Sequence, residues 1–150
     1  MTEPTRALRG RLLSFTDDPA TAGEASYSYI EDGLVLLGGG KIVEVGAASE
    51  LLPRLTTQVL VDHYPDGLIL PGFIDAHIHF PQTQVIASYG AQLMDWLERY
   101  AFAEELRFAD PEHAAAVAGF FLDELVRNGT TTAAVYGTVH AQAAEAFFTE

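Results

Sequence analysis

Cysteine is absent from the 150 residues, and no apolar run approaches the roughly 18 residues that a membrane-spanning helix requires. Without thiols, this stretch can form neither disulfide bonds nor thiolate-ligated metal sites. Basic residues are also few: 8 Lys and Arg stand against 21 Asp and Glu, which gives a net charge of -13. This charge would repel nucleic-acid phosphates and anionic lipid, so we expect neither nucleic acid nor a membrane as a partner. Any metal here would need histidine and carboxylate ligands.

The N-terminal sequence MTEPTRALRGRLLSF lacks the pattern of a secretion signal. An acid and a proline occur early, and no apolar region of about 7 to 15 residues precedes a small-residue cleavage site. We therefore predict a cytoplasmic protein. A content of 49% hydrophobic and 19% charged residues is ordinary for a globular protein with a core.

The first 66 residues are predicted to form a small β-layer. Strands are expected at 7–15, 27–36, 41–45 and 57–64. The glycines at 38–40 have the permissive backbone of a hairpin turn between the second and third of these strands. Pro65-Asp66-Gly67 is interpreted as a break that ends the β-layer.

From residue 67 the sequence alternates strands and helices. The run LILPGFIDAHIHF has apolar residues on both faces along most of its length, as expected of a parallel strand buried under helices. Helical spacing follows in AQLMDWLERY, and a better-marked helix runs from the N-cap Asp110, with Pro111 at its first position, to just before Gly129. A strand in TTTAAVYGTV and the start of a further helix in AQAAEAFFTE complete the pattern.

This order of elements predicts an α/β protein with right-handed βαβ units in residues 67–150. Two such units cannot close a barrel, because a (β/α)8 barrel takes roughly 250 residues. If the sheet belongs to a barrel, that barrel is incomplete within 150 residues. The last helix has no cap, which leads us to expect a longer chain.

The stretch PGFIDAHIHFPQ, residues 71–82, ends the buried strand with two histidines one residue apart. Alternation along a strand puts Asp75, His77 and His79 on one side and the isoleucines on the other. Two neutral imidazoles at this spacing can reach one divalent ion, with zinc the first choice. The plainer reading is two partly exposed histidines on one face. The position at the end of a buried strand favours metal ligation.

A catalytic zinc site usually takes three protein ligands and leaves one position open for water. The ligands beyond His77 and His79 must therefore come from elsewhere. His140, near the end of the second predicted strand, is only roughly placed, and a surface loop is its alternative role. For Asp75 two roles stay open: orienting a ligand, or hydrogen-bonding backbone. His113 is predicted to be a solvated surface residue.

Three sequence blocks follow one another in a recognisable order: HIHFPQ at 77–82, MDWLERYAFAEELRF at 94–108 and NGTTTAAVYGTVH at 128–140. Together with the preceding PGFID, they resemble the metal-dependent amidohydrolase superfamily, and the guanine deaminase family within it. The similarity covers most of residues 27–150. Ala103 and Leu106 depart from the family pattern, where a proline and a more polar residue are expected, which puts the local loop shape in doubt.

The resemblance implies the start of a (β/α)8 TIM-type barrel, preceded by strands of a small β-sandwich domain in residues 1–66. It also implies a homodimer and one Zn2+ per chain. His77 and His79 match the first two zinc ligands. His79, Phe80, Pro81 and Gln82 match the segment that touches the purine. The general acid–base group and the other ligands belong to regions of the family outside these residues.

The implied reaction is hydrolytic deamination of guanine to xanthine and ammonia by a zinc-activated water, in purine catabolism. The planar amide of Gln82 offers a donor and an acceptor, which can pair with the lactam or ring-nitrogen edge of the purine. Pro81 would fix the backbone of the loop. Phe80 either walls the pocket or packs in the core, and Trp96 with Tyr100 forms either a core stripe or a lid.

Two alternatives remain from the sequence. One is an amidohydrolase that deaminates or dechlorinates another heterocycle, such as a pyrimidine, a triazine or a modified adenosine. The other is a non-catalytic relative of the same fold. Gln82 and the WLERYAFAEELRF block favour guanine over the other heterocycles.

Overall fold

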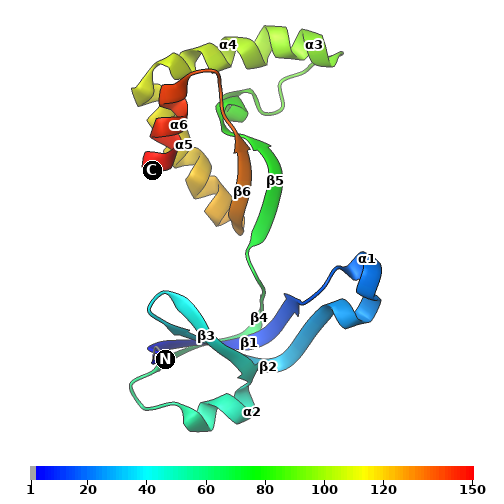
Figure 1. The fold of residues 1–150 in the computed structure, drawn as a ribbon, viewed down its shortest axis with the longest axis vertical. Coiled ribbons are helices and arrows are strands. Elements are labelled where there is room, and N and C mark those ends of the chain that lie inside the picture. The colour runs from blue at the N-terminus through cyan, green and yellow to red at the C-terminus, as the bar shows by residue number, and fades with distance from the viewer. Residues whose placement is uncertain (1–2) are drawn as a thin grey trace. The chain divides into compact units, whose positions relative to one another are not determined.

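A computed structural model describes residues 3–150, which form a mixed α/β structure (Figure 1). The chain divides into two compact units, with the boundary between Pro71 and Gly72. The sequence-based boundary lay between residues 66 and 67, before the last strand of the first unit had ended. No helix within residues 3–150 is long and apolar enough to cross a membrane.

The first unit is a four-stranded sheet in the order β3-β2-β1-β4. The strands are β1 (Arg6–Phe15), β2 (Tyr27–Gly38), β3 (Lys41–Ala47) and β4 (Leu60–Ile69), and the short helices are α1 (Pro19–Ala22), α2 (Ala48–Leu51) and the 3-10 turns Gly23–Ser26 and Leu52–Arg54. β1 pairs antiparallel with β2 and parallel with β4, and β2 pairs antiparallel with β3. The predicted hairpin is confirmed: Gly39 and Gly40 turn it with φ angles of 57° and 72°, which glycine adopts without strain.

The predicted break at Pro65-Asp66-Gly67 is wrong, because β4 continues through it to Ile69. The pairing with β1 instead shifts register, from Gly10 opposite Tyr64 to Arg11 opposite Leu68. The guanidinium of Arg11 donates hydrogen bonds to the carbonyl oxygens of Gly67 (3.2 Å) and Asp66 (2.8 Å). These bonds satisfy backbone groups that the sheet leaves unpaired. The turn residues therefore form a bulge within the strand.

The second unit contains the parallel pair β5 (Phe73–His79) and β6 (Thr130–Tyr136). Its long helices are α5 (Pro111–Arg127) and α6 (Ala141–Thr149), which lie on the same side of the two strands (Figure 1). Between β5 and α5 the chain forms the 3-10 turn Phe80–Val85, α3 (Leu93–Trp96), the π-helical turn Leu97–Ala101, α4 (Phe102–Glu105) and the 3-10 turn Leu106–Ala109. The predicted start of α5 is confirmed: the Asp110 carboxylate accepts a hydrogen bond from the Glu112 backbone N–H at 3.0 Å.

The core of this unit is built from aromatic rings and small side chains. Its buried members are Phe80, Phe108, Ala114, Val117, Ala118, Phe121 and Ala143. The partly buried Ile78 and Val135 pack against this cluster, so each strand contributes one face to the core. The sequence predicted that the strand ending in His79 is buried on both faces. This prediction is not met, because no residue of β5 is buried and Ile74 is 75% exposed. Among the described residues β5 pairs only with β6 and is covered on one face.

Candidate active site

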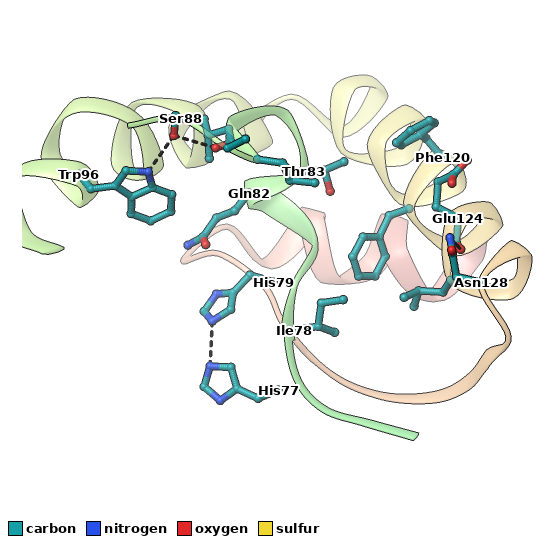
Figure 2. A pocket seen from close by; sticks show the side chains of 15 residues that line it. His77, Ile78, His79, Gln82, Thr83, Ser88, Trp96, Phe120, Glu124 and Asn128 are labelled. Carbon is teal, nitrogen blue, oxygen red and sulfur yellow. Dashed lines mark hydrogen bonds between the residues drawn. The ribbon is translucent and has the colours of Figure 1, made fainter. Parts of the chain in front are cut away.

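The two histidines of β5 point in the same direction, away from the covering helices. Figure 2 shows the rings of His77 and His79 on one side of the strand and Ile78 on the other. The two Nε2 atoms lie 3.2 Å apart, and the ring centroids lie 5.2 Å apart. The period-two alternation of a strand places both rings on one face. The predicted convergence of the two imidazoles is therefore present in the structure.

The distance between the Nε2 atoms fits a shared metal ion. Zinc–nitrogen bonds of about 2.0–2.1 Å place two ligands of a tetrahedral ion about 3.3 Å apart. Each neutral imidazole presents a lone pair at Nε2 when its Nδ1 carries the proton. Among residues 3–150, no third His, Cys, Asp or Glu joins the pair to make a group of three that could hold a metal. These residues therefore supply part of a ligand set.

Tyr136, the last residue of β6, packs on both imidazoles. Its ring stacks on His79 at 4.7 Å with an interplanar angle of 12°, and lies 4.5 Å from the ring of His77. The parallel register places Tyr136 opposite His79. Aromatic contacts of this kind restrict the rings to one orientation. Tyr136 lies within the block NGTTTAAVYGTVH, but it was not singled out from the sequence, because its contact with the histidines depends on the register of β6 against β5.

The structure chooses between the alternative roles of Asp75. Its carboxylate accepts a hydrogen bond from the backbone N–H of His77 at 3.0 Å. This bond holds the backbone at His77. Among the described residues, the Asp75 carboxylate forms no hydrogen bond to either imidazole ring. His140 does not join the pair: it precedes α6, and its Nε2 is buried with no hydrogen-bond partner among the described residues.

Gln82 follows the histidines in the turn Phe80–Val85 and lies beside His79 (Figure 2). Its amide nitrogen donates a hydrogen bond to the Glu105 carboxylate at 3.0 Å. Glu105 belongs to α4 and was not singled out from the sequence, because its partner lies 23 residues away. Phe80 is only 1% exposed and packs in the core, and Pro81 is also fully buried. Of the four residues matched to the purine-contacting segment, His79 and Gln82 line the cavity described next.

An open cavity of about 650 Å³ includes the imidazole side of β5. On that side it is lined by His77, His79, Gln82 and Trp96. The indole N–H of Trp96 donates to the hydroxyl of Ser88 at 2.7 Å. The same cavity extends to the helix side of β5, where Ile78, Phe120 and Glu124 line it, so only part of its volume lies beside the imidazoles (Figure 2). Trp96 thus walls the cavity, and the core-stripe alternative is not met, because Leu93 at the start of the same helix is 71% exposed.

His113 is not the solvated surface residue that the sequence predicts. Its side chain is 14% exposed, and its ring meets Phe108 edge to face at 4.9 Å. Its Nε2 lies 3.5 Å from the Glu104 carboxylate. The side chain therefore packs between α5 and α4 and takes no part in the cavity described above.

Comparisons with known proteins agree with this geometry. The sequence profile of the Amidohydrolase family matches residues 68–150. Guanine deaminase of Escherichia coli (strain K12) is 40% identical over 146 residues, which are 95% of this chain and 33% of that protein. The solved structure of guanine deaminase from Bradyrhizobium japonicum superposes with a TM-score of 0.89 at 34% identity, and covers 98% of this chain and 32% of that one.

A further relative is 5-methylthioadenosine/S-adenosylhomocysteine deaminase 1 of Syntrophus aciditrophicus (strain SB). It is 39% identical over 105 residues, which are 69% of this chain and 23% of that protein. The 150 residues span about a third of the length of the E. coli relative. The family profile, in contrast, covers more than half of the 150 residues and includes both histidines of β5. The chain belongs to the amidohydrolase family.

Proposed function

We propose that the protein catalyses the zinc-dependent hydrolysis of guanine to xanthine and ammonia. The observation that carries this proposal is the convergence of two imidazole Nε2 atoms, 3.2 Å apart, next to the amide of Gln82 in one cavity. The identity to guanine deaminases along nearly the whole chain supports guanine as the heterocycle.

In this proposal His77 and His79 hold the zinc ion through Nε2. When bound, zinc supplies the Lewis acidity that makes water nucleophilic near neutral pH. The stacked ring of Tyr136 keeps both imidazoles facing the cavity, and the backbone bond from Asp75 fixes the position of His77. The Gln82 amide orients the flat polar ring of the substrate by hydrogen bonding. Substrate contact is proposed for His79, at the end of β5, and for Gln82, and the buried Phe80 and Pro81 support the turn that carries Gln82.

The rest of the site is proposed to come from segments beyond these 150 residues, because the relatives are about three times as long. Those segments would supply the remaining zinc ligands and the general acid–base group. We further propose that β5 and β6 begin a (β/α)8 barrel and that the β1–β4 sheet belongs to a small β-sandwich. A homodimer in the cytoplasm is the assembly and location that the family implies. Sedimentation and cell fractionation test these two points.

A different aminated heterocycle is the second candidate substrate. The similarity to the Syntrophus deaminase, whose name specifies adenosine derivatives, favours a modified adenosine among the alternatives. Adenine carries its amino group at C6, whereas guanine deamination occurs at C2, so the two substrates must bind in different orientations. The interactions of Gln82 are therefore central to the choice between them.

Ammonia release by the purified full-length protein should be faster with guanine than with adenine, cytosine, a triazine or 5-methylthioadenosine. Gln82→Ala should lower kcat/KM for guanine by about 10 to 100-fold, because a buried hydrogen-bond partner of the substrate contributes roughly 1–3 kcal/mol. A coupled assay for ammonia with each compound measures both effects.

Gln58→Ala is the matched control for this experiment. Gln58 is an exposed residue of the first unit, whereas the cavity is lined by residues of the second unit. Its loss should leave kcat/KM within about twofold, because surface substitutions usually have small effects. Equal rates with all the compounds, or a faster rate with 5-methylthioadenosine, would reject guanine as the substrate.

A further inference from the structure

The side-chain amide of glutamine is ambiguous as a recognition element. Its carbonyl accepts and its NH2 group donates, and a half-turn about the terminal bond exchanges their positions. A purine edge presents donors and acceptors in a fixed order. A freely turning amide would therefore bind each edge only in part of its conformations, and would discriminate poorly between heterocycles with opposite patterns.

Glu105 removes this ambiguity for Gln82. Its ionised carboxylate has only acceptors, so it can bind the NH2 end of the amide and not the carbonyl end. The observed bond joins Gln82 Nε2 to Glu105 Oε1 at 3.0 Å, and both side chains are partly buried. A charge-assisted bond of this kind is stronger than one between neutral groups. It leaves the carbonyl oxygen and one N–H of Gln82 free for another partner.

Contacts of the adjacent residue anchor the helix that carries Glu105. Glu104, next to it in α4, accepts hydrogen bonds from Arg107 at 2.8 and 2.9 Å and lies 3.5 Å from His113 of α5. Arg107 also donates to Gln84 at 2.6 Å, in the same turn as Gln82. This polar cluster connects α4 to α5 and to the turn that carries Gln82.

The π-helical turn Leu97–Ala101 sets the direction of Glu105 around the helix. In a regular α-helix Trp96 and Glu105 would lie about 180° apart. One extra residue in a π turn reduces this separation to about 80°. Trp96 lines the cavity, and Glu105 reaches Gln82 of the same cavity. The π turn thus allows one irregular helix to place both side chains on the cavity side.

We propose that Glu105 is a positioning residue that fixes the orientation in which the Gln82 amide meets the substrate. The inference rests on the proposed function only in that Gln82 contacts the substrate. Glu105 is not among the residues that line the cavity, so we expect it to act on the substrate only through Gln82. Substitution of Glu105 should therefore change KM for the substrate, and this change should require Gln82. The zinc content should stay the same.

A double-mutant cycle on the full-length protein tests this proposal. Wild type, Glu105→Gln, Gln82→Ala and the double variant are compared by kcat, KM and zinc content. The glutamine at 105 keeps the size of the side chain, but it can both donate and accept, so it no longer selects one orientation of Gln82. We expect Glu105→Gln to raise KM by about 3 to 10-fold with unchanged zinc content. In the Gln82→Ala background the same substitution should change KM by less than about 1.5-fold.

Glu98→Gln serves as the control, since it makes the same chemical change on the exposed side of the π turn. An equal rise in KM with and without Gln82 would overturn the proposal, as would an unchanged KM in Glu105→Gln. The cycle uses the heterocycle that the wild-type protein deaminates fastest, or binds most tightly if none is deaminated. Preference for a heterocycle other than guanine would reject the proposed function, while the cycle on that heterocycle would still decide the role of Glu105.

Discussion

Replacing both His77 and His79 by alanine is expected to abolish zinc binding and guanine deamination together. The two Nε2 atoms form one binding point, 3.2 Å apart, and loss of even an outer-shell contact typically weakens metal binding by 10 to 100-fold. Loss of two direct ligands should therefore lower activity by at least about 10³-fold. Zinc measured by plasma emission should fall from near one per chain to background.

His63→Ala is the control for this double variant, because His63 is an exposed residue of β4 in the first unit. It should retain zinc and activity. Circular dichroism of the double variant should match the wild type, since both imidazoles lie outside the buried core. Full zinc content in the folded double variant would show that these histidines are not ligands.

Phe80→Ala is expected to have the largest effect on stability. The ring is 1% exposed, meets Phe108 edge to face at 5.3 Å and lies 4.8 Å from Phe147. Truncation of a buried phenylalanine leaves a cavity and typically lowers the free energy of unfolding by about 3–5 kcal/mol. Urea denaturation followed by circular dichroism measures the change. A loss below about 1 kcal/mol would contradict a core role.

Two further variants separate packing from substrate contact. Phe148→Ala removes a ring that is 87% exposed and should change stability by less than about 0.5 kcal/mol. Phe80→Leu keeps an apolar side chain in the core and should restore much of the stability with KM for guanine unchanged. A raised KM in a stable Phe80→Leu variant would show that the ring contacts the substrate after all.

Local signals made part of this structure predictable. The hairpin turn at Gly39 and Gly40 and the N-terminus of α5 depend on residues within a few positions of one another. The continuation of β4 depends instead on Arg11, whose hydrogen bonds span 55 and 56 residues of sequence. A Pro-Asp-Gly triplet carries no information about such a distant partner, so its turn propensity led to the wrong prediction.

The same distinction applies to the candidate site. The shared direction of the His77 and His79 side chains follows from strand alternation alone, because residues i and i+2 of a strand lie on the same face. Tyr136 reaches them only through the register of β5 against β6, and Glu105 reaches Gln82 only after a π turn has rotated the helix. Neither the register nor the π turn has a clear sequence signature. The convergence of the two imidazoles was therefore predictable from the sequence, and the contacts of Tyr136 and Glu105 were not.

Trp96 is the only tryptophan in these 150 residues, and its indole lines the cavity. Indole fluorescence depends on the polarity around the ring, so a compound that displaces water there alters the emission. The protein thus carries an intrinsic optical reporter at its candidate site. Subtracting the spectrum of a Trp96→Phe variant would isolate that signal from other tryptophans of a longer chain, and would allow ligand affinity to be followed without any turnover.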